Sequence, residues 1–305
     1  MEVTAKKKKT SKSRVAFLLF CIVPPLLHFL IFYIYPNISS FFMAFTNVDG
    51  EFSFDNFTRF YKEIANPDSE LRIGLKNTAL TFGLLVATFP FKVLVSYFIY
   101  KKVPGHKFYR IVFFLPTIIF SVAMALIFQQ FVGIDSFIAK WVQDACELSY
   151  VPDLLADSDF ANTVILLNLL WIGFPGDLII WGGTFARIPD DVLESGKVDG
   201  TTWWTEFTKI IVPMVWPTVA LQMVLLACGF FGASGSVFLL TKGQYGTMTF
   251  AAWQYLELYE YSGSQYTSNI YNYLSAVGLI TTVIAVTISV TVRKFANNVF
   301  EEVEF

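Results

Sequence analysis

The chain has 305 residues, of which 55% are hydrophobic and only 15% are charged. Ordinary soluble domains carry about 25% charged residues, so this composition favours a protein that crosses a membrane several times. The sequence contains no P-loop motif, which excludes an ATPase of that class. Its three cysteines are scattered, without a CxxC pair that would indicate a disulfide framework or a zinc site.

Six apolar stretches are long enough to cross the hydrocarbon core of a bilayer, which takes about 20 residues. They cover about 15–35, 77–99, 108–132, 162–186, 212–239 and 270–292. The first follows a basic run, as a signal peptide does, but it is too long and no small-residue cleavage pattern follows it. We therefore predict an all-α integral membrane protein with six transmembrane helices over 15–292, between a basic N-terminal tail at 1–14 and a C-terminal tail at 293–305.

Lysine and arginine are concentrated on one side of this arrangement. The basic side comprises the N-terminus, the connection 100–110, the loop 187–210 and the C-terminus. Because cytoplasmic loops carry an excess of these residues, the bias predicts that both termini are cytoplasmic. The opposite loops are then 36–76, 133–161 and 241–269. The last is rich in tyrosine, which predicts an aromatic belt with a docking surface or, alternatively, a surface on which sugars stack.

The stretch 187–217 is the most polar long segment between two apolar ones. A short helix fits 191–198, where Asp191 can act as the N-cap. Glu194 follows three residues later, at a spacing like that of a capping box. Gly200 can end this helix and turn the chain.

A second helix fits 202–212, with Pro213 and Pro217 at the start of the next span. One apolar stripe runs along it, formed by Trp203, Phe207, Ile210 and Met214. The two segments predict a kinked helix pair at a membrane surface, attached by its apolar side and presenting polar residues to a partner in the cytosol. The alternative is an ordinary amphipathic loop between two spans.

These residues resemble the "EAA" signature of binding-protein-dependent ABC importer permeases. The matching positions are Glu194, Asp199, Gly200, Phe207, Ile210, Pro213 and Pro217. The chain departs from the signature at Ser195, Gly196, Thr201 and Val212, where it has other small or apolar residues. The resemblance implies that the loop 187–210 is a coupling helix that docks into a groove on an ATPase subunit. The residues to which it assigns ATPase coupling are Glu194, Ser195, Gly196, Asp199, Gly200, Phe207, Ile210 and Pro213.

Further segments look like the carbohydrate branch of that family, of the maltose and multiple-sugar type. They are FYIYPNISSFFMAFTN at 32–47, FDNFTRFY at 54–61, Asn77-Thr78, RIVFFLP at 110–116 and YLSAVG at 273–278. The resemblance implies a non-catalytic permease subunit of the bacterial cell membrane that imports a sugar or oligosaccharide. The partners it implies are a second permease, expected to be a different chain, two cytosolic ATPases that hydrolyse ATP, and an extracytoplasmic sugar-binding protein. It implies no cofactor and no nucleic acid.

Three other functions remain as alternatives. An ABC permease for a non-sugar solute would share the same signature. A secondary transporter working without ATPases is disfavoured because no inverted repeat is evident. An intramembrane enzyme is disfavoured because the chain has no HExxH, no GxSxG and no paired catalytic carboxylates.

Two ionisable residues lie inside predicted spans, and such residues are functional candidates. Lys92 follows Pro90, and Asp177 follows Pro175-Gly176. Each lies 15 positions after the start of its predicted span, and the two spans run in the same direction, so the side chains can pair at similar depth. Alternatively, Lys92 extends toward the cytoplasmic face while Asp177 lines the substrate path alone.

The fifth predicted span contains GFFGASGS at 229–236. Small residues there predict close helix packing, or a break that exposes backbone groups to a translocation cavity. The further substrate-path candidates in this region are Gln222, Phe230 and Ser234.

Overall fold

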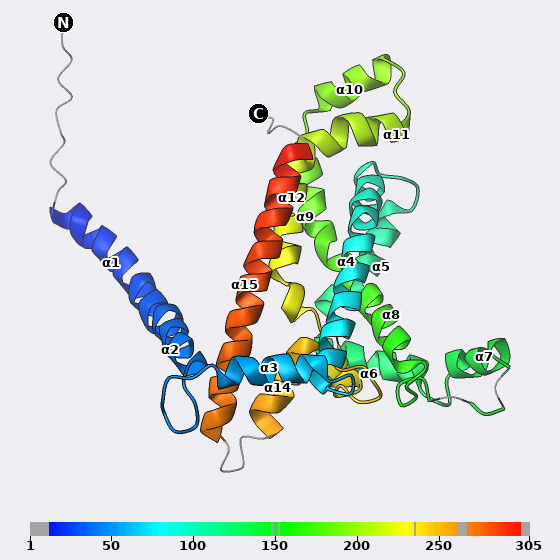
Figure 1. Ribbon diagram of the computed structural model, residues 1–305. Helices are drawn as coiled ribbons and strands as arrows, with labels where there is room; N and C mark the ends of the chain where they lie inside the picture. The colour runs from blue at the N-terminus through cyan, green and yellow to red at the C-terminus, as the bar shows by residue number, and fades with distance from the viewer. Residues whose placement is uncertain (1–11, 148, 152, 235, 261–266, 300–305) are drawn as a thin grey trace, which may run out of the picture. The chain divides into compact units, whose positions relative to one another are not determined.

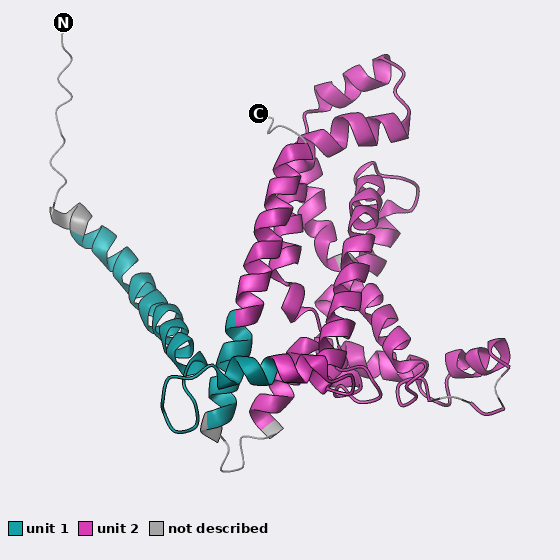
Figure 2. Ribbon diagram, viewed as in Figure 1, with its two compact units in different colours: residues 1–60, 264–279 teal, residues 61–263, 280–305 magenta. Residues whose placement is uncertain are grey.

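The computed structural model describes residues 12–147, 149–151, 153–234, 236–260 and 267–299 (Figure 1). The basic residues Lys6 to Lys9 of the predicted N-terminal tail and the end of the predicted C-terminal tail lie outside the described residues. The chain divides into two compact units, coloured separately in Figure 2. Unit 1 comprises residues 1–60 and 264–279, and unit 2 comprises residues 61–263 and 280–305.

The predicted all-α membrane fold is confirmed, because helices dominate the described residues. Five helices are long and apolar enough to cross a membrane. They are Ala16–Ala44, Glu70–Tyr100, Ala161–Phe185, Trp203–Cys228 and Asn269–Val299. A bent helix pair, His106–Ile118 and Ser121–Val132, brings the number to six when it is counted as one span.

Unit 1 is a long apolar helix followed by a tight turn and parts of two further helices. Its elements are α1 (Lys12–Phe29), the π-helix η1 (Leu30–Ile34), α2 (Tyr35–Ala44), the first part of α3 (Asp55–Ala65) and the first part of α15 (Thr267–Val299). The buried Asn56 side chain donates hydrogen bonds to the carbonyl oxygens of Ala44 (3.1 Å) and Thr46 (3.0 Å), which ties α3 to the end of α2. The Arg59 guanidinium lies 3.9 Å from the centre of the Tyr273 ring, a cation–π contact between α3 and α15.

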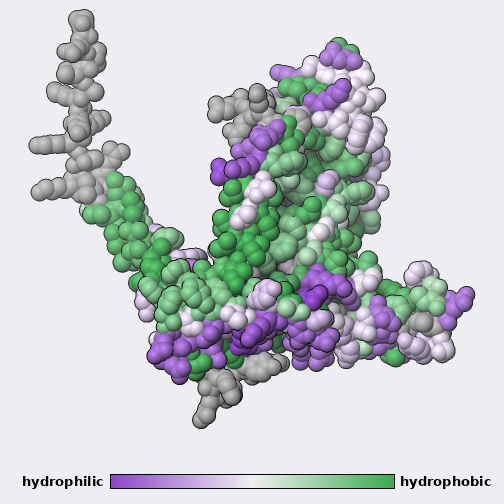
Figure 3. Space-filling model, in the orientation of Figure 1, coloured by the Kyte–Doolittle hydropathy of each residue, from purple (hydrophilic) through white to green (hydrophobic). Residues whose placement is uncertain are grey.

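Unit 2 holds the other spans and the helix pair between them, together with the ends of α3 and α15. Its elements are α4 (Glu70–Tyr100), α5 (His106–Ile118), α6 (Ser121–Val132), α7 (Phe137–Ala145), α8 (Ala161–Gly173), η2 (Pro175–Asp177), α9 (Leu178–Phe185), α10 (Asp190–Val198), α11 (Trp203–Glu206), η3 (Phe207–Ile211), α12 (Val212–Cys228), η4 (Phe230–Gly232), α13 (Val237–Leu240) and α14 (Phe250–Glu260). In Figure 3, hydrophobic residues cover the spans of this unit, while hydrophilic residues are more frequent over α10 and α11.

Two of the predicted spans are broken in the structure, and the first predicted span continues to Ala44 instead of ending near residue 35. The span predicted at 108–132 is not one helix, because α5 and α6 meet at an angle of 108°. Ile119 and Phe120 between them have extended backbone, with ψ values of 138° and 136°, and Pro116 lies near the end of α5. The span predicted at 212–239 ends at Cys228, because the chain leaves the helix at Gly229 and continues as the short helices η4 and α13. Glycine favours such helix ends since it restrains the backbone least.

The predicted outer loop 241–269 is partly helical and packs on a span. Asn77 of α4 donates hydrogen bonds to the carbonyl oxygens of Gly246 (2.7 Å) and Met248 (2.8 Å). The hydroxyl of Thr78 accepts a bond from the Phe250 backbone N–H at 2.8 Å. These buried bonds hold the start of α14 against α4. The Asn77-Thr78 pair therefore satisfies backbone groups that would otherwise be buried without partners.

The core of unit 2 joins three spans to the helix pair. One cluster of buried side chains draws on α4, α9, α10, η3 and α12. Its members are Val93, Tyr97, Trp181, Phe185, Ile188, Leu193, Phe207, Ile211, Val215 and Val219. Because Leu193 and Phe207 belong to the same cluster as the spans, the helix pair cannot move as an independent loop without uncovering apolar surface.

Candidate functional site

The first helix of the predicted pair is α10, and it starts one residue earlier than expected. Its N-cap is Pro189, and no side chain caps the helix, so the prediction that Asp191 forms a cap with Glu194 was wrong. The proline has extended backbone with ψ 134° and brings the chain directly into the helix. Asp190 and Asp191 instead lie in the first turn, where a negative charge interacts favourably with the helix dipole.

The end of α10 follows the prediction for Gly200. This residue has φ +73°, in the left-handed region that glycine enters without steric cost. The Gly200 N–H donates to the Lys197 carbonyl (3.1 Å), and the Thr201 N–H donates to the Gly196 carbonyl (3.0 Å). These two bonds form a Schellman motif, which closes the helix and fixes the direction of the chain after it.

The second helix of the pair is continuous with the following span. Thr202 is its N-cap and accepts a bond from the Thr205 N–H at 3.3 Å. The helix then runs through α11, the π-helix η3 and α12 without a break. Pro213 lies at the start of α12, two residues after the π-helix, so it marks a change of helix type rather than the beginning of a span. A wider turn before a proline accommodates its missing N–H and its ring.

The signature residues divide into a buried set and an exposed set. Gly196 is buried against Ile210, because a methyl group in place of its hydrogen would lie 3.0 Å from the Ile210 Cδ1 atom. Phe207 is buried in the core cluster, and Pro213 is half-buried. On the helix pair, the exposed set consists of Glu194, Ser195, Asp199 and Gly200, and Pro217 is exposed farther along α12. Among the residues assigned to ATPase coupling, the exposed set on the helix pair is the one accessible to a partner.

Two apolar residues that the sequence analysis did not select are also exposed on the pair. Val198, the last residue of α10, is 88% exposed, and Trp204 of α11 is 54% exposed. They add apolar surface beside the exposed signature residues Asp199 and Gly200. The signal that identifies them is their position close to the polar turn 199–202.

A buried carboxylate attaches the pair to α4, and the sequence analysis missed it. Glu206 is only 5% exposed. Its Oε1 atom accepts a bond from the Lys101 ammonium at 2.6 Å and from the Tyr97 hydroxyl at 3.2 Å. The sequence did contain a signal for this contact. Glu206 lies between the apolar residues Trp203 and Phe207, where an unpaired buried charge would destabilise the fold.

Lys92 and Asp177 form the predicted ion pair. The Lys92 Nζ atom lies 3.0 Å from Asp177 Oδ2, and the two side chains are 9% and 35% exposed. Asp177 sits at the break between α8 and α9, and each residue lies eight positions before the end of its span. At a rise of 1.5 Å per residue, the pair is about 12 Å along the helices from those ends. This bond excludes the arrangement in which Lys92 extends alone to the membrane surface, whereas a contact of Asp177 with substrate stays a prediction.

The structure does not join the remaining candidates to this pair. Gln222 is half-buried on α12, and Ser234 is half-buried in the segment after η4. The Phe230 ring packs edge-on against Phe82 at 4.8 Å. Among the described residues, no hydrogen bond, ion pair or ring contact links these three to Lys92 or Asp177. The described part of the chain also contains no group of His, Cys, Asp and Glu side chains that could hold a metal ion.

The ion pair predicts an asymmetric double-mutant cycle. Asp177→Leu leaves the more buried charge of Lys92 without a partner, whereas Lys92→Met leaves a carboxylate that reaches water. Because losing one partner of a fully buried pair costs about 3–5 kcal/mol, we expect roughly 1–3 kcal/mol here, with Asp177→Leu the worse. The double variant should recover roughly 1 kcal/mol or more in thermal unfolding in detergent. Additive effects would contradict the pairing, and Lys76→Met on the exposed face of α4 serves as a control.

The Glu206 cluster, which consists of Glu206, Lys101 and Tyr97, predicts the opposite asymmetry, in which loss of the lysine is worse than loss of the acid. Lys101→Met leaves a carboxylate buried with only the Tyr97 hydroxyl, whereas Glu206→Gln leaves a lysine that is 27% exposed. We expect Lys101→Met to lower thermal stability by about 2 kcal/mol or more and Glu206→Gln by less. Limited proteolysis within 187–202 should rise in the same order. The exposed Lys209→Met is the matched control, and an equal effect of Lys209→Met and Lys101→Met would refute the attachment.

Comparisons with known proteins place this geometry in a family. The family model described as "Binding-protein-dependent transport system inner membrane component" matches residues 75–301. The multiple sugar-binding transport system permease protein MsmF of Streptococcus mutans is 25% identical over 274 residues, covering 89% of this chain and 91% of the relative. The probable starch degradation products transport system permease protein AmyD of Thermoanaerobacterium thermosulfurigenes is 25% identical, covering 80% of this chain and 83% of the relative.

A solved structure shares the fold. It is a bacterial ABC transporter involved in the import of the acidic polysaccharide alginate, with a TM-score of 0.76 and 21% identity, and the match covers 94% of this chain and 97% of that one. Since the family model matches residues 75–301, which is more than half of the chain and includes the helix pair, the chain belongs to the family of binding-protein-dependent transport system inner membrane components.

Proposed function

We propose that the chain is a permease subunit of an ATP-driven importer and carries a sugar or oligosaccharide across the membrane. The observation that carries this proposal is the division of the helix pair 187–210 into two faces. Glu194, Asp199 and Gly200 are exposed, while Gly196 is buried between the two helices of the pair and Phe207 is buried in the cluster shared with the spans. A surface of this kind suits a partner that pushes on the pair from outside the membrane.

The pair is built to pass such a push to the spans. Leu193 of α10 and Phe207 of η3 share one apolar cluster with α4, α9 and α12. The bonds of Glu206 to Lys101 and Tyr97 add a polar attachment to the end of α4. Movement of α10 therefore moves three spans together. Coupling of this kind, driven by closure and opening of two ATPase subunits, would expose a central path alternately to the two sides of the membrane.

The proposed assembly contains further chains. A second permease subunit, expected to be a different protein, completes the path, and two cytosolic ATPases bind the helix pairs and hydrolyse ATP. An extracytoplasmic binding protein delivers the sugar. A sugar is favoured over other solutes by the names of the relatives, since MsmF is named for multiple-sugar binding and AmyD for starch degradation products. In this assembly the chain itself catalyses no covalent step.

The proposed orientation places both termini and the helix pair in the cytoplasm. It rests on the distribution of lysine and arginine, which cluster in the N-terminal tail, the connection 100–110, the loop 187–210 and the start of the C-terminal tail. Loop 133–161, which is acidic, then faces the outside, as does the segment 241–260 that packs on α4 through Asn77.

Single cysteines in a variant without Cys21, Cys146 and Cys228 test this orientation. A thiol at the exposed position Ser195 should react with an impermeant reagent only after the cytoplasmic side is opened. A thiol at the exposed position Asp144 of α7 should react in intact cells. Labelling of both positions from the same side would rule out the proposed topology.

Two substitutions in the helix pair test the coupling function. Gly200→Val forces a β-branched side chain into the left-handed region, which costs at least about 1–2 kcal/mol, and Glu194→Lys reverses an exposed charge. We expect both variants to reach the membrane but to lose most sugar uptake and most co-purification of the ATPase. Gly200→Asn, which tolerates this conformation, and Asp144→Lys, a charge reversal on α7, should behave almost as the parent chain. Unimpaired uptake and ATPase association in Gly200→Val and Glu194→Lys would argue against the coupling role.

A further inference from the structure

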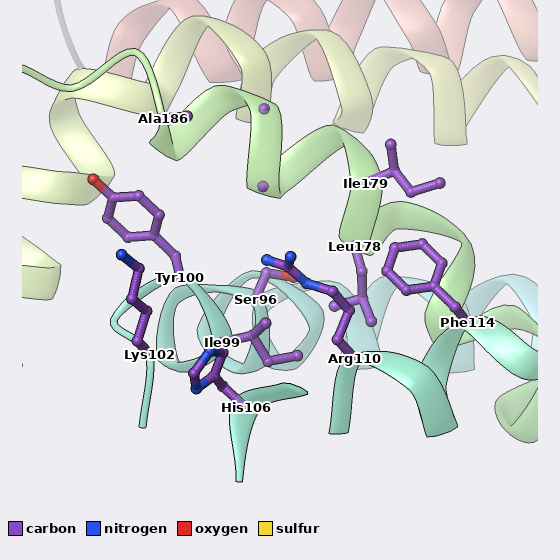
Figure 4. Close-up of a pocket in the computed structure, with 12 residues that line it drawn as sticks. Ser96, Ile99, Tyr100, Lys102, His106, Arg110, Phe114, Leu178, Ile179 and Ala186 are labelled. Atoms are coloured by element: carbon purple, nitrogen blue, oxygen red, sulfur yellow. The ribbon is translucent and has the colours of Figure 1, made fainter. Parts of the chain in front are cut away.

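Unit 2 contains a second site that the proposed transport cycle does not use. A cavity of about 470 Å³ lies between the last turns of α4, the start of α5 and α9 (Figure 4). Its basic side is formed by Lys102, His106 and Arg110, and Ser96 and Tyr100 contribute hydroxyl groups. The cavity lies at the same end of α4 as Lys101, which bonds Glu206 of the helix pair.

The positive charge of this cavity has no counter-charge in its walls. None of the residues that line it is acidic. Within the described part of the chain, neither Lys102 nor Arg110 lies within 4.0 Å of a carboxylate. The start of α5 adds to the positive potential, because its N-cap is Gly105, which has no side chain to cap the helix. A cavity of this charge favours an anionic ligand.

The other end of the cavity is apolar. Figure 4 shows Lys102 and Tyr100 at one end, Phe114 and Ile179 at the other, and the Arg110 guanidinium between them. Gly182 and Gly183 of α9 line the cavity, and a Cβ atom at either position would have no neighbour within 4 Å. The absence of these two side chains leaves the space open. The cavity thus offers a polar site for an anion and an adjoining apolar surface for hydrocarbon.

We propose that this cavity binds the phosphate group of an anionic phospholipid, with Arg110 and Lys102 holding the phosphate and Phe114 and Ile179 contacting an acyl chain. Basic pockets between spans on the cytoplasmic side are suited to such head groups, which are enriched in that leaflet. This leaflet assignment rests on the orientation given under the proposed function. A soluble phosphate would engage the same cations but would leave the apolar end unused.

Lipid binding to the full chain, purified in detergent with the subunits that accompany it, tests the proposal. Native mass spectrometry measures the occupancy of added phosphatidylglycerol and, in parallel, of phosphatidylcholine, which carries a phosphate but no net charge. We expect phosphatidylglycerol to bind in preference. Arg110→Gln and Lys102→Asn should each weaken it about fivefold. Asparagine is chosen because Lys102 has φ +54°, which asparagine tolerates.

Two further variants separate the cavity from general surface charge. Lys107→Gln removes a cation from the exposed surface of the same helix without touching the cavity, and it should leave lipid binding unchanged. Gly182→Leu fills the cavity without altering charge, and it should reduce phosphatidylglycerol binding as strongly as Arg110→Gln. Equal loss in Lys107→Gln and Arg110→Gln, or full binding in Gly182→Leu, would overturn the proposal.

A third arm distinguishes the source of the phosphate. Inorganic phosphate at millimolar concentration should not displace phosphatidylglycerol. Complete displacement, with no preference between phosphatidylglycerol and phosphatidylcholine, would assign the cavity to a soluble anion and overturn the lipid assignment. Because occupancy is measured without sugar or ATP, it does not depend on the transport function. If the parent chain supports sugar uptake but shows no preference for phosphatidylglycerol, only this proposal is refuted. If it prefers phosphatidylglycerol but supports no sugar uptake, only the proposed function is refuted.

Discussion

The structure of unit 2 depends on the burial of the helix pair against the spans. Leu193 and Phe207 enter the cluster that also holds Tyr97 and Trp181, so the polar loop and the membrane helices share one core. Close packing makes such a core resist gradual deformation, and motion at one edge shifts the packed elements as a group. The buried carboxylate of Glu206 also fixes the orientation of the helix pair on α4. A charge-assisted bond to Lys101 allows a smaller range of distances and angles than apolar contact does.

Charged groups inside the bundle are paired, and one member of the intramembrane pair lies at a break in its span. Asp177 lies where α8 gives way to α9 through a short 3-10 turn, and this interruption directs its carboxylate toward Lys92. Removing two charges from water costs more free energy than an exposed ion pair gains. A membrane bundle therefore keeps such charges only when they are paired. The Lys92–Asp177 pair and the bond between Lys101 and Glu206 therefore link α4 to the break before α9 and to α11.

Much of this fold follows from patterns of length and polarity, and the exceptions have physical causes. The spans around 77–99 and 162–186 were predictable from apolar length, and the Lys92–Asp177 pair from their matched position. The bend between Ile118 and Ser121 was not, because an uninterrupted apolar stretch gives the same signal whether the helix is straight or broken. Glu206 escaped notice because polarity alone places a glutamate on the outer face, and only tertiary contact with Lys101 reverses that placement.

Two π-helices, each just before a proline, affect which face of the following helix can be inferred from the sequence. Leu30–Ile34 ends two residues before Pro36, and Phe207–Ile211 ends two residues before Pro213. A π turn holds about one residue more than an α turn, so every side chain beyond it is rotated by about 100° relative to an uninterrupted helix. A helical wheel drawn from Trp203 through Cys228 would therefore assign the wrong face to the membrane part. The buried face of α11 and the buried face of α12 are therefore offset around the helix axis, although the two helices form one continuous backbone.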